Sequence, residues 1–252
     1  MTGETNAGSP LSVLLVEDNE VNRRIALAFL ASAGHSVTVC VDGESALEAM
    51  AKADYDVLLM DIQMPGIGGL ETARRIRSLG DAKKARVPIL AMSASVREED
   101  SRSYFAAGMN GIIGKPLRRE AVNNLLASVV ADHSPPTADT ETPVDVVDSD
   151  RMETLAEALG PARLAELCGV ARQSMVDTAD ALRRAWEKED RPLVASSAHR
   201  LAGVANNFGC PALGRVASDI ETDCRNGGSG RHMESRFTTV LAASLAALPQ
   251  VP

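Results

Sequence analysis

The stretch DVLLMD, residues 56–61, decides the fold that the first half of the sequence predicts. It is a short, continuous apolar run that ends in an acid, and similar runs recur along this half, separated by amphipathic stretches of helical length. Strands that are apolar on both faces and alternate with helices are typical of a parallel sheet covered on both sides. We therefore expect an α/β doubly wound, flavodoxin-like sheet of five parallel strands, at residues 13–16, 37–41, 57–60, 87–92 and 111–113.

Polar side chains follow these runs at the points where the strands are expected to end. The carboxyl ends of parallel strands meet at one edge of a doubly wound sheet, which is where ligands bind. Crowded carboxylates repel one another unless a cation lies between them, and Mg²⁺ is a hard ion that prefers oxygen ligands. Each residue taken alone also fits a helix cap, a turn or an ordinary surface position. Together they predict a Mg²⁺ site beside a hydroxyl and an ammonium group, formed by Glu17, Asp18, Asp61, Ser93 and Lys115.

The composition limits the classes of function. Asp and Glu outnumber Lys and Arg by 34 to 26, the net charge is −8, and aromatic residues make up 3% of the chain. A protein that binds a phosphate backbone or stacks bases needs the opposite composition, so we expect no nucleic-acid partner. The sequence has no apolar run of membrane-spanning length and no signal-peptide pattern at its start, so we expect a cytoplasmic chain without direct membrane insertion. Its four widely spaced cysteines predict reduced packing residues.

The composition changes abruptly in the middle of the chain. Residues 131–150 hold three prolines and six acids but neither Lys nor Arg. Such a segment cannot build a core and is extended by charge repulsion. We therefore expect four parts: a flexible N-terminus at 1–10, an α/β domain at 11–132, an acidic, Pro-containing linker at 133–149 and a second domain at 150–252.

After the linker the sequence predicts only helices. The breaks between them are short and rich in Gly and Pro, which is typical of neighbouring helices in a bundle. We expect an all-α helix bundle, with helices near 150–159, 161–188, 191–208, 211–226 and 231–248.

The third of these helices carries a buried stripe and a histidine outside it. Apolar residues spaced four and three apart predict the buried face, formed by Val194, Ala198, Leu201, Ala205 and Phe208. At 100° per residue, His199 lies roughly 140° from the centre of this stripe. We therefore expect His199 on the exposed face, beside Gly203, whose missing side chain would let another protein approach the ring.

Four motifs of the first half resemble the signatures of response-regulator receiver domains: VLLVEDNEVN, DVLLMDIQMPGIGG, PILAMSAS and GMNGIIGKPL. The VEDNEVN form is similar to receivers attached to hybrid sensor kinases. The resemblance covers roughly residues 11–132. It implies that Asp61 is the phosphoacceptor, that Asp18 binds Mg²⁺ directly and that Glu17 assists through water. It also implies that the backbone carbonyl of Gln63 is a metal ligand.

The same resemblance implies a phosphorylation switch. Ser93 would be the switch hydroxyl and Lys115 the partner of the phosphoryl group. Phosphoryl transfer passes through a charge-rich transition state, so Mg²⁺ and Lys115 supply the positive charge that it needs. A hydrogen bond from Ser93 to the phosphorylated Asp61 would then shift an existing conformational equilibrium. One position departs from the family, which has Tyr or Phe where this chain has Ile112.

The stretch AHRLAGVANNFGCPALGRVASDIE, residues 198–221, resembles the histidine phosphotransfer (HPt) domain, and the resemblance extends over roughly 150–248. It implies that His199 is the phosphorylated residue. The HPt motif has a lysine three residues after the histidine, where this chain has Ala202, and Arg200 is a candidate electrostatic substitute. We assign structural roles to the other histidines, which are His35, His133 and His232.

These features together predict a two-component phosphorelay signalling protein. Asp61 would accept a phosphoryl group from a histidine kinase, and His199 would pass phosphoryl groups to or from the aspartate of a receiver, with a downstream response regulator as the next partner. The sequence shows no ATP-binding kinase core, so we expect a phosphotransfer protein and not an enzyme. One alternative is an interaction protein switched at Asp61, with His199 inactive. Another is a Mg²⁺-dependent phosphatase, although Gln63 stands where such enzymes have a second acid.

Overall fold

The structure is a computed structural model that divides into two compact units, one within residues 1–139 and one within 140–252. The first unit contains a β-sheet with helices, and the second contains helices. The expected flexible N-terminus and most of the expected linker lie outside the described residues, so the predicted domain boundaries stay predictions. The structure describes residues 10–93, 98–115, 117, 122 and 148–249.

A five-stranded sheet forms the centre of the first unit. The strands lie in the order β2-β1-β3-β4-β5, and every neighbouring pair is parallel. This confirms the predicted doubly wound fold. The fourth strand begins later than predicted, after Pro88, because proline has no amide hydrogen to donate to the ladder. The strands are β1 (Ser12–Val16), β2 (Ser36–Cys40), β3 (Val57–Asp61), β4 (Ile89–Ser93) and β5 (Gly111–Gly114).

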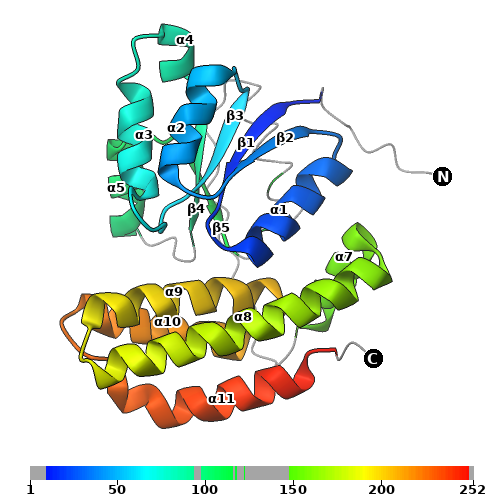
Figure 1. The fold of residues 1–252 in the computed structure, drawn as a ribbon, viewed down its shortest axis with the longest axis vertical. Helices are drawn as coiled ribbons and strands as arrows, with labels where there is room; N and C mark the ends of the chain where they lie inside the picture. Colours follow the sequence, from blue (N-terminus) through cyan, green and yellow to red (C-terminus); the bar gives the residue numbers. More distant parts are fainter. Residues whose placement is uncertain (1–9, 94–97, 116, 118–121, 123–147, 250–252) are drawn as a thin grey trace. The chain divides into compact units, whose positions relative to one another are not determined.

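Helices cover both faces of this sheet. Figure 1 shows α1 on one face and α2, α3 and α5 on the other. Because strand side chains alternate between faces, Leu14, Leu58 and Ile89 pack with Met50 of α2 and Tyr104 of α5 in one hydrophobic cluster. The short helix α4 has no counterpart in the sequence prediction. The helices are α1 (Glu20–Ser32), α2 (Gly43–Lys52), α3 (Gly69–Arg77), α4 (Ala82–Ala85) and α5 (Glu98–Ala106).

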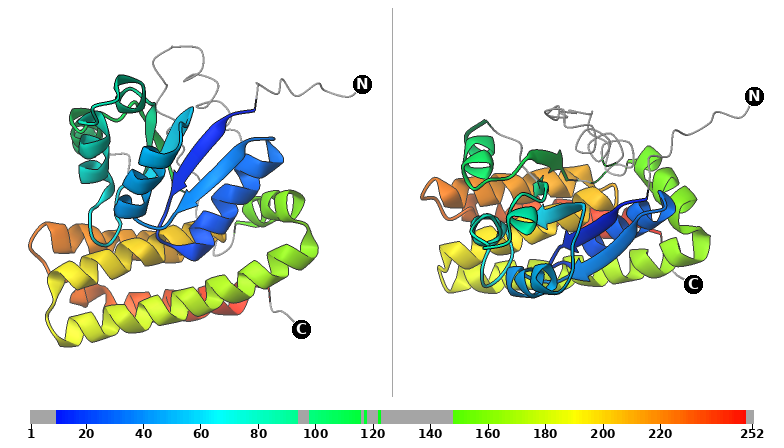
Figure 2. Two further views of the ribbon diagram at one scale, coloured as in Figure 1. Left: turned by 45° about the horizontal axis from the view of Figure 1, so that its top comes forward. Right: turned by 90° about the horizontal axis from the view of Figure 1, so that it is seen from above.

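The second unit confirms the predicted helix bundle. Helices α8, α9 and α10 each have a proline in the first turn, where the missing amide hydrogen costs nothing. Helix α9 packs against both α8 and α10, and α11 packs against α10; Figures 1 and 2 show this arrangement from three directions. The elements are α7 (Ser149–Leu159), α8 (Pro161–Glu187), α9 (Arg191–Asn207), α10 (Pro211–Arg225), the 3₁₀ helix η1 (Arg231–Met233) and α11 (Glu234–Ala247).

The interior of the bundle matches the sequence prediction in two respects. All five residues of the predicted stripe on α9 are buried, and the four cysteines of the chain are free and buried. Burial raises the pKa of the Cys210 thiol to about 11, so this thiol stays protonated at neutral pH.

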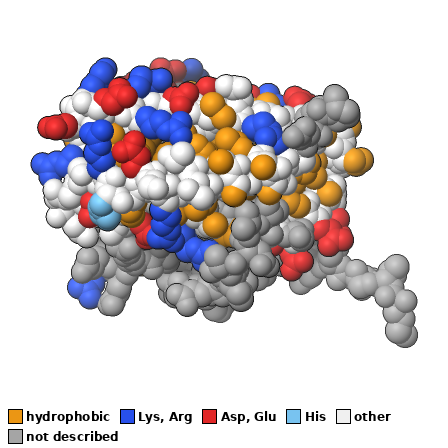
Figure 3. Space-filling model, turned by 90° about the horizontal axis from the view of Figure 1, so that it is seen from below, with side chains coloured by type: hydrophobic (Ala, Val, Ile, Leu, Met, Phe, Trp, Pro, Cys, Tyr) orange, Lys and Arg blue, Asp and Glu red, His pale blue; other side chains and the backbone are white. Residues whose placement is uncertain are grey.

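The outer surface of the bundle is partly apolar. Alanines of α11 at positions 242, 243, 246 and 247 are exposed, and Figure 3 shows hydrophobic side chains gathered on the face seen from below. Charged side chains lie mainly toward one side of the same view. Within the described part of the chain, the helices are too short or too polar to cross a membrane.

Candidate functional site

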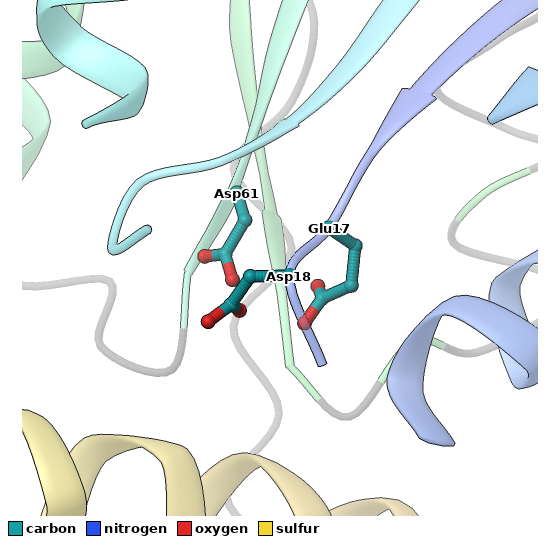
Figure 4. A group of neighbouring side chains, drawn as sticks. All are labelled: Glu17, Asp18 and Asp61. Carbon is teal, nitrogen blue, oxygen red and sulfur yellow. The ribbon is translucent and has the colours of Figure 1, made fainter. Parts of the chain in front are cut away.

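Three carboxylates meet where β1 and β3 end. The two strands are neighbours, with Val16 paired to Met60, so the residues that follow or end them lie at the same edge of the sheet. Ligand oxygens of Glu17, Asp18 and Asp61 lie within 4.8 Å of one another. Figure 4 shows the three side chains extending beyond the strand ends. Three carboxylates this close form a set of hard oxygen donors that suits a divalent cation such as Mg²⁺.

Lys115, which follows β5, contacts two of these carboxylates. Its Nζ atom lies 2.8 Å from Glu17 Oε2 and 2.8 Å from Asp61 Oδ2, and all three side chains are buried. Burial raises the pKa of Glu17 to about 7, the charge of Asp61 adds to this shift, and Lys115 opposes it. Burial lowers the pKa of Lys115, but the charges of Asp61 and Glu17 outweigh this, and its pKa lies above the ordinary value. Lys115 is therefore charged at every physiological pH.

Residues of the first turns of α1 support the site, and the sequence analysis missed them. Asn22 Nδ2 donates a hydrogen bond of 2.9 Å to Glu17 Oε1. Arg23 Nη1 donates to the backbone carbonyls of Glu17 at 2.9 Å and Asp18 at 3.0 Å. The available signal was their spacing, because the first turn of a helix that follows the acids directly must lie beside them.

The backbone around Asp61 is tightly packed. The amide of Gln63 donates to Asp61 Oδ1 at 3.3 Å, which fixes one carboxylate oxygen. A Cβ atom at Gly69 would lie 2.1 Å from the carbonyl oxygen of Asp61, so only glycine allows α3 to start this close to the strand end. The predicted metal-ligand role of the Gln63 carbonyl stays a prediction.

Ser93 ends β4 and is buried at the same edge of the sheet. Its Oγ atom lies 3.0 Å from Tyr104 Oη, a hydrogen bond in which either hydroxyl can be the donor. The sequence analysis did not select Tyr104. Ile112 of β5 is buried in the hydrophobic cluster that also contains Tyr104.

The predicted exposure of His199 was wrong. The residue is 7% exposed, and Gly203 is buried as well. A single apolar stripe predicts a helix that is covered on one side, whereas α8 and α10 both pack against α9. The ring of His199 lies against α10, where its Nδ1 atom is 3.1 Å from Glu221 Oε2. Glu221 therefore belongs to this site, and the sequence analysis did not select it.

The contact with Glu221 distinguishes the two ring nitrogens. A carboxylate only accepts hydrogen bonds, so Nδ1 of His199 is the donor in this contact, and Nε2 takes no part in it. Glu221 is also paired with Arg225, one turn further along α10. Ala202 is fully buried in the bundle. Arg225 therefore places a positive charge beside the carboxylate that contacts His199.

Two of the remaining histidines make structural or surface contacts. His35 Nδ1 accepts a hydrogen bond of 3.2 Å from the amide of Leu11. The side chain of His232 is 68% exposed and lies 4.0 Å from Asp223. His133 lies outside the described residues.

Comparison with known proteins identifies both units. The family model of the response regulator receiver domain matches residues 13–127, and that of the Hpt domain matches residues 166–250. The chain is a receiver domain followed by an Hpt domain. Such domains carry phosphoryl groups in two-component phosphorelays, which confirms the predicted class of function.

Relatives of this receiver–Hpt chain include much longer sensor kinases. It is 36% identical to the sensor histidine kinase AruS of Pseudomonas aeruginosa over 219 residues, which are 85% of this chain and 21% of AruS. It is 33% identical to the sensory/regulatory protein RpfC of Xanthomonas campestris, covering 82% of this chain and 29% of RpfC. One similar solved structure is the receiver domain of a Pseudomonas aeruginosa sensor kinase with a magnesium ion in its active site cleft. It is 34% identical to this chain, and the match covers 49% of this chain and 99% of that one, with a TM-score of 0.45.

Proposed function

We propose that Asp61 is the phosphoacceptor of the receiver domain and that His199 is the phosphotransfer residue of the Hpt domain. The observation that carries the first assignment is the ion pair between Asp61 and buried Lys115, beside two further carboxylates. Asp61 is the acid that ends the central strand β3, and one of its oxygens is already fixed by the amide of Gln63. The second assignment rests on the hydrogen bond between His199 and Glu221.

The donor set at Asp61 fits Mg²⁺. We propose that Glu17, Asp18, Asp61 and the backbone carbonyl of Gln63 hold the ion, with Glu17 acting through water. When bound, Mg²⁺ neutralises charge on the transferring phosphoryl group. Lys115 adds a second positive charge, because its buried Nζ atom lies 2.8 Å from Asp61 Oδ2 and 2.8 Å from Glu17 Oε2.

The transfer to Asp61 exchanges one bond for another. A carboxylate oxygen of Asp61 forms a bond to the phosphorus of a kinase phosphohistidine as the P–N bond breaks, and the electron pair returns to the imidazole nitrogen. Asp61 becomes an aspartyl phosphate. Lys115 then pairs with the phosphoryl oxygens, and the Ser93 hydroxyl donates a hydrogen bond to one of them.

The transfer at His199 runs between an imidazole and a receiver aspartate. Nε2 of His199 forms a bond to the phosphorus of an aspartyl phosphate as the P–O bond breaks, and the aspartate leaves as a carboxylate. The ring gains positive charge in this step, and Glu221 stabilises it at Nδ1. The reverse step returns the phosphoryl group to an aspartate.

The partners follow from this chemistry. We propose that a histidine kinase supplies the phosphoryl group and that a downstream response regulator receives it. The chain itself would carry phosphoryl groups without ATP chemistry of its own. Because the phosphoryl groups of such a relay come from ATP, we place the reaction in the cytoplasm.

Two matched pairs of variants test the assignments. Asp61→Asn should abolish Mg²⁺-dependent labelling by a small acyl phosphate, whereas Asp54→Asn, at an exposed ion pair, should label like the wild type. His199→Gln should abolish labelling by a phosphorylated receiver, whereas the change His232→Gln at an exposed histidine should not. Undiminished labelling of Asp61→Asn would contradict the first assignment. A wild-type chain that labels at Asp61 but never at His199 would favour the interaction protein with a silent histidine.

A further inference from the structure

The switch serine of this receiver is bound to a tyrosine from a helix. Ser93 Oγ and Tyr104 Oη lie 3.0 Å apart, and the two residues are 4% and 6% exposed. The receiver resemblance led us to expect an aromatic residue on β5, where this chain has Ile112. Ile112 and Tyr104 pack in one hydrophobic cluster. The aromatic ring beside the switch therefore comes from α5 and occupies the same cluster as the β5 position that lacks one.

The number of hydrogens that the two hydroxyls can donate determines which of them is the donor when Asp61 is phosphorylated. A serine hydroxyl has one hydrogen to donate and two lone pairs to accept. If Ser93 donates its hydrogen to a phosphoryl oxygen on Asp61, it can only accept from Tyr104. The phenol must then be the donor, and hydrogen bonds in such a chain polarise and strengthen one another. A phenylalanine at position 104 could not supply this donor.

Tyr104 also lies at a structural junction. Its backbone carbonyl accepts hydrogen bonds of 3.1 Å from the amides of Ala107 and Met109. It thus connects the last turn of α5 to the segment that leads into β5, which begins at Gly111. A displacement of Ser93 toward Asp61 acts on this junction through the phenol.

We propose that Tyr104 is the positioning residue of the phosphorylation switch. It donates to Ser93, directs the serine proton toward the phosphorylated Asp61 and makes α5 follow the movement of Ser93. This inference rests on the proposed function, in which Asp61 accepts the phosphoryl group.

The experiment uses the full chain carrying His199→Gln, so that the phosphoryl group stays on Asp61. Tyr104→Phe removes the hydroxyl and keeps the ring. Tyr55→Phe is the matched control, because Tyr55 is the other tyrosine of the chain and is partly buried against the same cluster. Each chain is labelled with acetyl phosphate and Mg²⁺. The lifetime of the Asp61 phosphate and the hydrogen–deuterium exchange of the α5 peptide are then measured.

The parent chain and Tyr55→Phe should show the same lifetime and the same change in α5 exchange on labelling. Tyr104→Phe should still accept label, lose most of the α5 response and shorten the phosphate lifetime about fivefold, the factor that corresponds to one hydrogen bond. In a Ser93→Ala chain, adding Tyr104→Phe should change neither readout further, because the two residues act as one unit.

The results separate two failures. A longer lifetime in Tyr104→Phe, an unchanged α5 response, or an undiminished effect of Tyr104→Phe on the Ser93→Ala background would overturn the role of Tyr104. Failure of the parent chain to accept Mg²⁺-dependent label at Asp61 would instead overturn the proposed function.

Discussion

The substitution Lys115→Met tests the electrostatic design of the receiver site. It keeps a long unbranched side chain but removes the ammonium that lies 2.8 Å from both Glu17 Oε2 and Asp61 Oδ2. These side chains are at most 4% exposed, so water cannot replace the lost charge. Two carboxylates would then face each other in the interior without the cation between them.

The expected effect on stability is large and depends on pH. At 2.8 Å, the Coulomb attraction within each ion pair is about 6 kcal/mol at an effective dielectric constant near 20. The cost of removing the charges from water offsets most of this attraction. Removing one partner of a buried ion pair costs about 3–5 kcal/mol, so we expect Lys115→Met to lower the free energy of unfolding of the receiver by about this amount in metal-free buffer at pH 7. Without the ammonium, Glu17 and Asp61 share one proton between pH 7 and 5, because the folded-state pKa of the pair lies above the unfolded value. Stability is therefore lost as the pH rises, and the variant should regain about 1.4 kcal/mol per pH unit between pH 7 and 5.

Urea unfolding in metal-free buffer measures this effect, with circular dichroism following the whole chain. Trp186, the single tryptophan, lies in the Hpt unit, so its fluorescence follows that unit alone and should not shift. Lys83→Met is the matched control, because Lys83 pairs with Asp54 at 2.6 Å but both side chains are mainly exposed. The expectation is wrong if Lys115→Met lowers the receiver transition no more than Lys83→Met does, or if the Lys115→Met chain is no more stable at pH 5 than at pH 7.

Three further outcomes follow from the contacts of other buried groups. Titration calorimetry should show Mg²⁺ binding about tenfold more weakly at pH 6 than at pH 8, because burial raises the pKa of Glu17 to about 7 and the ion needs this carboxylate deprotonated. An affinity that does not change over this range would contradict the carboxylate cluster as the binding site. Glu221→Gln should slow transfer to His199 by about 10²-fold in a phosphotransfer assay, because the neutral amide no longer stabilises the charged ring; an unchanged rate would exclude this role. Arg151→Met should lower the free energy of unfolding of the Hpt unit by about 1–3 kcal/mol, measured by Trp186 fluorescence. In the interior, Arg151 donates hydrogen bonds to the backbone carbonyl of Asn207 at 3.1 Å and to the Asn207 side chain at 3.2 Å.

Much of the receiver was predictable because its signal is local. Continuous apolar runs define the strands, and the carboxyl ends of parallel strands must meet at one edge, so the sequence alone predicts that Asp61, Glu17 and Lys115 lie together. The supporting contacts of Asn22 and Tyr104 could not be predicted in this way. Whether a helix residue reaches the site depends on how closely its helix packs against the sheet, and the periodic pattern of the sequence does not specify this distance.

The Hpt unit shows the same limit more clearly. The helix boundaries followed from Gly and Pro breaks, but the surroundings of His199 did not follow from its angle on α9. A helical wheel predicts which face is most apolar, whereas α9 has two neighbours and therefore two covered faces. Glu221 is 22 residues away on α10, and its pairing with His199 depends on the register between the helices.

The two residues that we propose as nucleophiles lie beside opposite charges. Asp61 pairs with the cation Lys115, which would attract an incoming phosphoryl group and neutralise it after transfer. The ring of His199 lies against the carboxylate of Glu221, which would stabilise positive charge on the ring but repel a phosphoryl group, and the guanidinium of Arg225 pairs with the same carboxylate. Ala202 removes the ammonium that the HPt motif places near the ring. If Asp61 and His199 carry the phosphoryl group as we propose, the receiver site should retain it, and the Hpt site should form and release its bond readily, as a carrier between two aspartates must.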